Sequence, residues 1–466
     1  MTQTAGMSSD EKARLDDLDL KYVLHPFTSI REHEASGPLM MVEGHGCRIS
    51  DSAGNSYLDA MAGVWCVNIG YGNLEMADAM RAQTARLSYY HSFSSMANDV
   101  STLLAQRLVE LAPVPMSKVF FGSSGSDAND TQVKLVWYYN NVLGRPEKKK
   151  IISRRRGYHG VTVLAAGLTG LEWAHSGFDV PLPMIRHIGD PYRLWAAEPG
   201  MTDSEFSAQL ARELEELIVA EGPETVAAFI AEPIQGVGGV IVPPAGYFEA
   251  ISEVLHRYDV LMIVDEVVCG FGRLGYWFGT EALGVQPDLM TLAKGITSAY
   301  VPLSACLISE PVWEVLEQGS DRYGVFGHGY TYTAHPLAAA AALTNLHIIE
   351  RDGLVEQASA RGEYLQRRLR ESFTGHPMVG EVRGQGLIGA VEFVASNDPL
   401  TRCDPELHVG ARVTRASRER GVLTRALWGD IIAFSPPLIV TESEIDTMVE
   451  VTRAALDEVA ADLVTA

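Results

Sequence analysis

Two charged residues, Asp265 and Lys294, directly follow apolar runs of the sequence. Asp265 comes at the end of the run 260–266, and Lys294 follows the run 289–293, 29 residues after Asp265. A lysine removed from water is a competent amine nucleophile that can form a Schiff base. A buried carboxylate needs a positive or hydrogen-bonding partner, and a pyridinium N–H would serve. A ring nitrogen held in its protonated form makes such a ring an electron sink.

Two further segments could complete a site of this kind. The segment 120–129 reads as a strand, a Gly/Ser turn and a helix start, where backbone N–H groups and a serine hydroxyl can hold a phosphate. In the loop 157–160, Tyr158 lies between two glycines and could stack on a planar ring. Each feature alone has an ordinary explanation, such as a capped helix or a packed tyrosine. Together the four features predict a pyridoxal phosphate site.

The elements that must position these residues alternate between apolar runs and amphipathic helices. This pattern is typical of helices layered on a mostly parallel sheet. We predict helices at 204–220 and 248–258, and strands at 226–233, 260–266 and 289–294. Polar residues stand at the C-terminal ends of these strands, and in open α/β sheets that edge binds ligands.

The last third of the chain predicts a smaller α+β unit. A helix with a leucine stripe begins near Leu354, strand-like residues fill 381–394, and a closing helix starts at the capping box 441–444. Two strand signals within the first 60 or so residues, MMVEGHG and RISDSAGNSYLDA, are expected to join this unit. The segment 384–389 matches G-x-G-x-x-G but is followed by another strand pattern, which favours a hairpin over a dinucleotide site.

Composition excludes several classes of protein. The hydrophobic fraction is 47% and the formal net charge is −22, so the chain is globular and its acid excess argues against a nucleic-acid partner. No apolar run reaches the roughly 18 residues of a membrane helix. The polar N-terminus, MTQTAGMSSDEKARLDD, does not resemble an export signal. Five scattered cysteines without metal-ligand spacing indicate a reducing cytoplasm, and we expect no metal site.

These motifs identify a resemblance that covers nearly the whole chain. The sequence DEVVCGFGR at 265–273 followed by Lys294-Gly295 is highly specific, and LHPFTS, SSGSDAND, GYHG and GHGYTYTAHP agree with it. The chain resembles a class III (ω-type) aminotransferase of pyridoxal phosphate fold type I. The resemblance implies a large cofactor-binding domain at 71–335, with a mostly parallel sheet flanked by helices. It also implies a smaller α+β domain built from both termini, 1–70 and 336–466.

The resemblance also implies roles for individual residues. Lys294 and Asp265 would be the catalytic pair: Lys294 would hold pyridoxal 5'-phosphate covalently, and Asp265 would pair with its ring nitrogen. The family's active sites lie between subunits, which implies a homodimer or a dimer of dimers in which Thr331 and Tyr89 act on the partner's site. The other cofactor contacts would be Ser124, Gly125, Ser126, Tyr158, His159, Glu232 and Val267, and the substrate pocket would comprise Phe27, Trp65, Tyr89, Tyr158, Val237 and Arg425.

The implied activity is transfer of an amino group from a primary amine or ω-amino acid to an α-keto acid. The chain resembles the pyruvate-dependent ω-aminotransferases in Trp65 of GVWCVN and in an arginine before the GD of a late loop, here Arg425. A decarboxylase or aminomutase on the same fold is the main alternative. A non-catalytic scaffold is disfavoured because Lys294 and Asp265 are both present, and a nicotinamide oxidoreductase is the weakest alternative because it rests only on the hairpin that begins at Gly384. The sequence leaves open the physiological amine, the stereochemical preference, and dimer versus tetramer.

Overall fold

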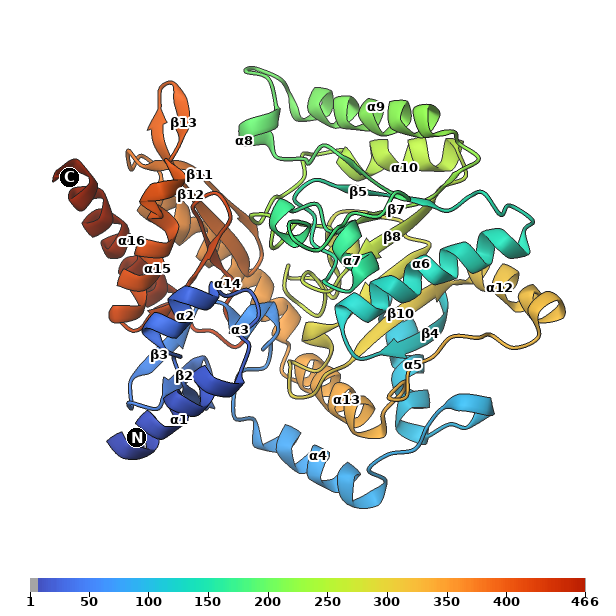
Figure 1. Cartoon of the computed structure of the whole chain (residues 1–466), viewed down its shortest axis with the longest axis horizontal. Helices are drawn as coiled ribbons and strands as arrows, with labels where there is room; N and C mark the ends of the chain where they lie inside the picture. Colours follow the sequence, from blue (N-terminus) through green and yellow to red (C-terminus); the bar gives the residue numbers. More distant parts are fainter. Residues whose placement is uncertain (1–6, 466) are drawn as a thin grey trace.

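The computed structural model describes residues 7–465, so the first six residues of the predicted segment 1–70 lie outside it. Its larger unit is built on a seven-stranded sheet (Figure 1). Strand β10 runs antiparallel to both of its neighbours, and the other pairs are parallel, as predicted. In spatial order the strands are β4 (Met116–Gly122), β10 (Ser304–Ser309), β9 (Leu289–Leu292), β8 (Leu261–Asp265), β7 (Val226–Ala231), β5 (Lys150–Arg154) and β6 (Ile185–Ile188).

Helices cover both faces of this sheet. In Figure 1, α9 (Asp203–Glu221) and α10 (Tyr247–Arg257) lie on one side, and α6 (Gly125–Val142) and α12 (Glu310–Tyr323) lie on the other. The predicted helices 204–220 and 248–258 agree with α9 and α10 to within a residue. The start of α9 is fixed by the Thr202–Glu205 capping box, and its buried stripe of Phe206, Leu210 and Leu214 packs into an apolar cluster with strand residues.

The smaller unit contains an antiparallel sheet with three helices, α14 (Leu354–Phe373), α15 (Val409–Glu419) and α16 (Glu442–Thr465). The G-x-G-x-x-G segment is a hairpin, because Gln385 pairs directly with Ile388. Gly386 at its turn has φ +56°, and a Cβ there would lie 2.5 Å from the Leu274 backbone, so the turn requires glycine. The strands of this sheet are β11 (Val379–Gln385), β12 (Ile388–Asn397), β13 (Leu400–Arg402), β15 (Arg425–Leu427) and β16 (Ile431–Phe434).

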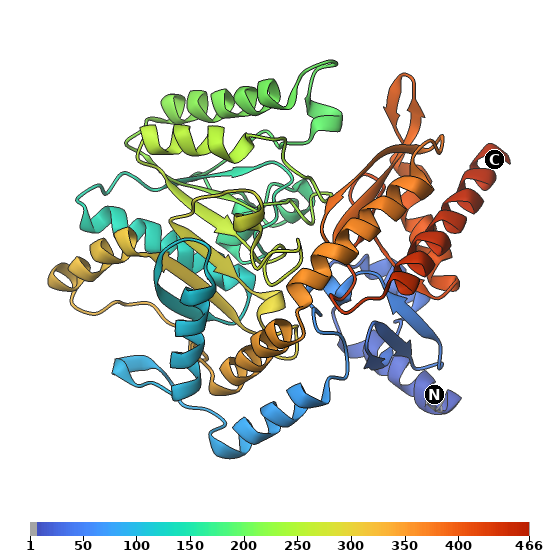
Figure 2. The same cartoon turned by 180° about the vertical axis from the view of Figure 1, so that it is seen from behind.

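The N-terminal strands form a separate small sheet that the C-terminal part completes. The signal predicted at 48–60 is two strands, because Asp51 Oδ1 accepts hydrogen bonds from Ala53 N and Asn55 N and so closes a turn. Strand β14 (Val422–Leu423) adds in parallel to β3. The two chain ends are therefore built into one unit, as Figure 2 also shows from behind. The N-terminal strands are β1 (Met41–His45), β2 (Arg48–Asp51) and β3 (Ser56–Asp59).

The remaining helices connect or flank these sheets. Across residues 7–465, no helix is both long and apolar enough to span a bilayer. The helices are α1 (Ser9–Tyr22), α2 (Ile30–Ser36), α3 (Ala62–Trp65), α4 (Leu74–Arg86), α5 (Asp99–Leu111), α7 (Val163–Leu168), α8 (Arg193–Ala196), α11 (Gly279–Ala282), α13 (Pro336–Arg351) and the 3-10 turns η1 (Phe93–Ser95), η2 (Glu172–Ala174), η3 (Lys294–Ile296) and η4 (Pro405–Leu407).

Candidate active site

Two cavities meet at Lys294 and Tyr158, which line both of them. The first cavity lies at the C-terminal ends of β8 and β9 and at the start of α6, where the sequence predicts ligand binding. It brings together the predicted residues Ser124, Gly125, Ser126, Tyr158, His159, Glu232, Asp265, Val267 and Lys294, and adds Asn129.

Asp265 lies at the floor of the first cavity and is held there as a carboxylate acceptor. Its side chain is 3% exposed. Its Oδ2 lies 2.9 Å from His159 Nδ1 and accepts a hydrogen bond from Asn129 Nδ2 at 2.8 Å, while Oδ1 accepts one from Val267 N at 3.1 Å. Asn129 was not predicted as a site residue, although it belongs to the quoted motif at 120–129. Asn129 Nδ2 also donates to His159 O, so the two residues that hold the Asp265 carboxylate are bonded to each other.

Glu232 positions the loop that carries the predicted stacking residue. Its buried carboxylate accepts hydrogen bonds from Tyr158 N and from Gly236 N, each at 2.9 Å. Burial raises the pKa of Glu232. The structure therefore places Glu232 beneath the Tyr158 backbone, with no hydrogen bond to Asp265 in the described part of the chain.

The start of α6 offers an anion-binding end to the same cavity. The Ser124 hydroxyl and the Asp127 side chain form a capping box. The N–H groups of Gly125 and Ser126, in the first turn, make no hydrogen bond within residues 7–465. A Cβ at Gly125 would lie 3.1 Å from Val267 Cγ2, so glycine preserves the space above Val267. Ser126 Oγ accepts from Val161 N, which fixes the neighbouring loop.

Lys294 lies in a short 3-10 turn after β9 with an unusual backbone. Its φ of +47° is in the left-handed region, which is strained for a residue with a side chain. Burial lowers the pKa of its ammonium group, which favours the neutral amine. Its Nζ lies 5.8 Å from the ring centroid of Trp65, and the guanidinium of Arg425 lies 5.6 Å from the same ring.

The second cavity has aromatic walls and leads to Lys294. It contains the predicted substrate residues Phe27, Trp65, Tyr158, Val237 and Arg425. Trp173 was not predicted; its ring lies edge-on to Phe27 at 5.3 Å and stacks with Tyr158 at 6.3 Å. Burial lowers the pKa of Arg425. Arg425 makes no ion pair among the described residues, and the nearby Asp430 carboxylate accepts a hydrogen bond from Gly410 N.

Tyr89 and Thr331 line neither cavity of their own chain. The Tyr89 hydroxyl donates to Thr331 O at 2.7 Å, and both residues are near the surface. The predicted action of these two residues on a partner's site stays a prediction.

The residues of the first cavity fit pyridoxal phosphate. The free N–H groups at Gly125 and Ser126 suit a phosphate, and Asp265 offers a carboxylate oxygen to a ring N–H. His159 contacts Asp265 through Nδ1, and its buried Nε2 has no hydrogen-bond partner within the described residues. No other group in this part of the chain therefore draws the ring away from Asp265.

Comparison with known proteins agrees with this geometry. The family model "Aminotransferase class-III" matches residues 30–456. The diaminobutyrate–2-oxoglutarate transaminase of Halomonas elongata is 50% identical, over 96% of each chain. The putrescine–pyruvate aminotransferase of Pseudomonas aeruginosa is 43% identical, over 94% of each chain. The crystal structure of the omega transaminase from Pseudomonas jessenii in complex with PMP superimposes with a TM-score of 0.94 at 48% identity, covering 96% of this chain and 98% of that one.

The match spans both units of the fold and all of the residues around Lys294. The fold and the predicted cofactor are thereby confirmed, and the chain is a transferase. It belongs to the class III aminotransferases, a family that works with pyridoxal phosphate.

Proposed function

We propose that the protein transfers the amino group of a primary amine or ω-amino acid to pyruvate, giving alanine and an aldehyde or ketone. The names of its relatives differ in the keto acid, since one contains 2-oxoglutarate and another pyruvate. The choice of pyruvate therefore rests on the charges of the second cavity.

The observation that carries this proposal is that the second cavity offers one guanidinium. Its charged lining residues are Asp59, Lys294 and Arg425. The Asp59 carboxylate already accepts from Met61 N, Gly63 N and the Tyr71 hydroxyl, so it is a structural acceptor. Lys294 is needed for the chemistry, which leaves Arg425 alone to bind a carboxylate. One guanidinium matches a monocarboxylate such as pyruvate, whereas a dicarboxylate would leave one buried charge unpaired.

Different residues of the chain carry out separate parts of the reaction. Bound pyridoxal phosphate supplies a ring that withdraws electrons from the substrate carbon. Asp265 keeps the ring nitrogen protonated, with His159 and Asn129 holding the carboxylate in place. Lys294 Nζ, at the junction of the cavities, removes the proton from the amine-bearing carbon, and its lowered pKa suits it to act as the base. The aromatic walls exclude water from an apolar amine.

A panel of amines offered with either pyruvate or 2-oxoglutarate tests the proposal. We expect alanine to form from pyruvate at the higher rate, with one amine consumed for each keto acid. A decarboxylase or an aminomutase would consume amine without that stoichiometry. Faster formation of glutamate from 2-oxoglutarate would contradict the pyruvate assignment.

Arg425 is expected to serve only one of the two half-reactions. We propose that it makes bidentate hydrogen bonds to the keto acid carboxylate and swings away when an apolar amine fills the same space. Arg425→Ala should slow the pyruvate half-reaction about thirtyfold, by loss of a charge-assisted contact of about 2 kcal/mol. The half-reaction with an uncharged arylalkylamine should change little.

Stopped-flow spectra of the two cofactor forms separate these steps. Arg425→Lys is the matched variant, because it retains the charge and loses the planar fork. Its rate in the pyruvate half-reaction should lie between those of wild type and Arg425→Ala. An equal loss in both half-reactions, or no loss in either, would place the carboxylate contact elsewhere.

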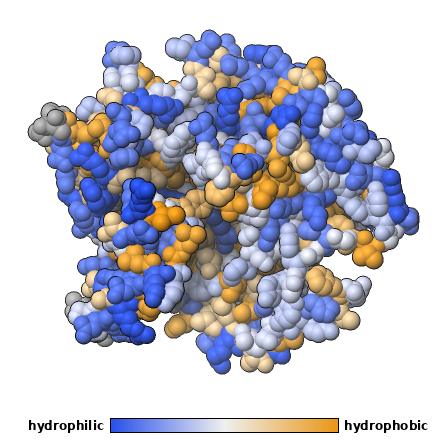
Figure 3. Space-filling model, viewed as in Figure 1, coloured by the Kyte–Doolittle hydropathy of each residue, from blue (hydrophilic) through white to orange (hydrophobic). Residues whose placement is uncertain are grey.

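We also propose that two copies share their active sites. The exposed Tyr89–Thr331 pair supports this, as do large apolar side chains exposed on the N-terminal segment, including Tyr22, Leu24 and Phe27. Figure 3 shows hydrophobic surface among hydrophilic groups at the lower left of the molecule, where Figure 1 places the N-terminal helices. Dilution to folded monomer should release the cofactor and remove activity. A fully active monomer in analytical ultracentrifugation would contradict this.

Two further parts of the proposal concern organisation and location. The division of the chain at residues 70 and 335 is supported by the position of the seven-stranded sheet between them. A cytoplasmic location is supported by five cysteines that are all free thiols.

A further inference from the structure

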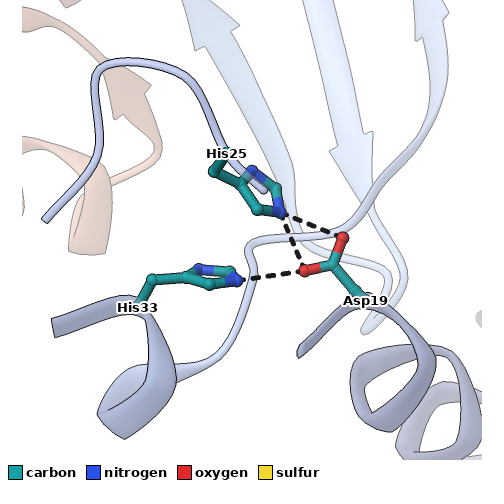
Figure 4. A group of neighbouring side chains, drawn as sticks. All are labelled: Asp19, His25 and His33. Atoms are coloured by element: carbon teal, nitrogen blue, oxygen red, sulfur yellow. Dashed lines mark hydrogen bonds and ion pairs between the residues drawn. The ribbon is translucent and has the colours of Figure 1, made fainter. Parts of the chain in front are cut away.

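A cluster of possible metal ligands lies in the N-terminal segment, outside the two cavities. Asp19 belongs to α1, His25 to the loop that follows, and His33 to α2 (Figure 4). One ligand atom from each residue can be chosen so that all lie within 4.8 Å of one another. The expectation of no metal site came from cysteine spacing, and this cluster contains no cysteine.

The geometry suits a single ion between the three side chains. Asp19 Oδ1 lies 2.8 Å from His25 Nε2 and 3.2 Å from His33 Nε2. A tetrahedral Zn²⁺ with bonds of 2.0–2.2 Å separates its ligand atoms by roughly 3.3 Å. The two distances to Asp19 Oδ1 are therefore within about half an ångström of this separation, and all three ligand atoms lie within 4.8 Å of one another. The two rings lie 4.2 Å apart between centroids and are tilted by 44°, and in Figure 4 both present a nitrogen to the same carboxylate.

Hydrogen bonding alone does not account for His33. His25 Nε2 hydrogen-bonds to both oxygens of Asp19, at 2.8 and 3.0 Å. His33 Nε2 is buried and makes no hydrogen bond in the described structure, although the carboxylate lies 3.2 Å away. His33 Nε2 therefore has Asp19 as an ion-pair neighbour but makes no hydrogen bond, and a lone pair directed at a metal ion would satisfy this nitrogen.

The surroundings allow an ion to enter. A hollow beside the cluster is lined by His25, His33 and Thr28, with Lys21 and Glu34 contributing one charge of each sign. The loop across it carries Phe27, which lines the second cavity and has a left-handed φ of +52°. An ion that joins α1, this loop and α2 would hold the strained Phe27 in position at the cavity wall.

We propose that Asp19, His25 and His33 bind a divalent transition-metal ion of the Zn²⁺ type, with water completing the coordination. Two imidazoles and one carboxylate favour this class over Ca²⁺ or Mg²⁺, which prefer oxygen ligands. Binding at this site does not depend on the substrates of the enzyme. The proposal and the assignment of pyruvate can therefore fail separately.

Equilibrium dialysis of the chelator-treated, full-length holoenzyme against Zn²⁺ tests the proposal. The variants are His25→Gln, His33→Gln and Asp19→Asn, with His256→Gln on the exposed side of α10 as the matched control. Wild type and His256→Gln should each bind one Zn²⁺ per chain at this site. Each ligand variant should weaken that affinity at least about 100-fold, since even outer contacts of a metal site cost 10- to 100-fold. Circular dichroism verifies that each variant is folded.

Co²⁺ provides a second readout, because its visible absorption reports tetrahedral N/O coordination. We expect this spectrum in wild type and its loss in the His25→Gln/His33→Gln double variant. Absence of Zn²⁺ binding by wild type would overturn the proposal. Binding that is equally strong in all three ligand variants would also overturn it, because the ion would then be held elsewhere.

Discussion

Lys294→Ala is expected to abolish turnover, with a loss of at least about 1000-fold. The substitution removes both the nucleophile that holds the cofactor and the base that moves the substrate proton, and base catalysis alone contributes about 10²- to 10⁴-fold. The protein should still fold, because Lys294 makes no ion pair in the described structure and its burial already disfavours the charged form. It should retain pyridoxal phosphate noncovalently through the start of α6 and Asp265.

Initial rates with pyruvate measure the loss of turnover, and the cofactor content after dialysis measures how much pyridoxal phosphate the variant retains. Lys118→Ala is a suitable control, because Lys118 is exposed and its Nζ lies over Trp313. The control should keep the wild-type rate. Turnover of Lys294→Ala within tenfold of wild type would exclude Lys294 as the central residue.

Asp265→Asn is expected to lower turnover about 100- to 1000-fold, the usual effect of removing one electrostatic contact in a catalytic site. The amide has nearly the same size as the carboxylate but cannot stabilise a protonated ring nitrogen. It would also bring an NH₂ group near Asn129 Nδ2 or Val267 N, both of which now donate to the carboxylate. The loss of turnover is expected to be electrostatic; the amide's similar size should let the protein fold, with some loss of stability where two donors meet.

Asp288→Asn separates this effect from general damage to β8. Asp288 Oδ2 accepts from Met262 N near the opposite end of the same strand. The control variant should keep its rate, while Asp265→Asn should also change the absorption spectrum of the bound cofactor. A normal rate and spectrum in Asp265→Asn would require another group at the ring nitrogen.

Much of the fold could be predicted because local patterns determine it. The stripe of α9 and the apolar run of β8 each require burial on a defined face, and the hairpin at 384–389 follows from glycine and the strand pattern after it. The split of 48–60 into β2 and β3 was missed, because a single Asp51 side chain closes the turn.

The site was predicted less completely, since its contacts join distant segments. Asn129 reaches Asp265 across 136 positions of sequence, and the packing of α6 against the sheet brings them together. Trp173 lies in the short 3-10 turn η2, a segment with no periodic signal, so its contact with Phe27 could not be foreseen. Glu232 was predicted as a cofactor contact; it lines the same cavity as Asp265, and its hydrogen bonds hold the backbone of Tyr158.

The parallel pairing of β3 with β14 has a consequence for synthesis on the ribosome. The N-terminal strands emerge first, but Val422 is made about 360 residues after Asp59. At about 5–20 residues per second, that interval lasts about 20–70 s. The seven-stranded sheet has all of its strands once residue 309 is made, whereas β3 keeps an unpaired edge throughout. Such an edge is open to pairing with other chains. The free edge of β3 is therefore open to incorrect pairing until Val422 and Leu423 have been made.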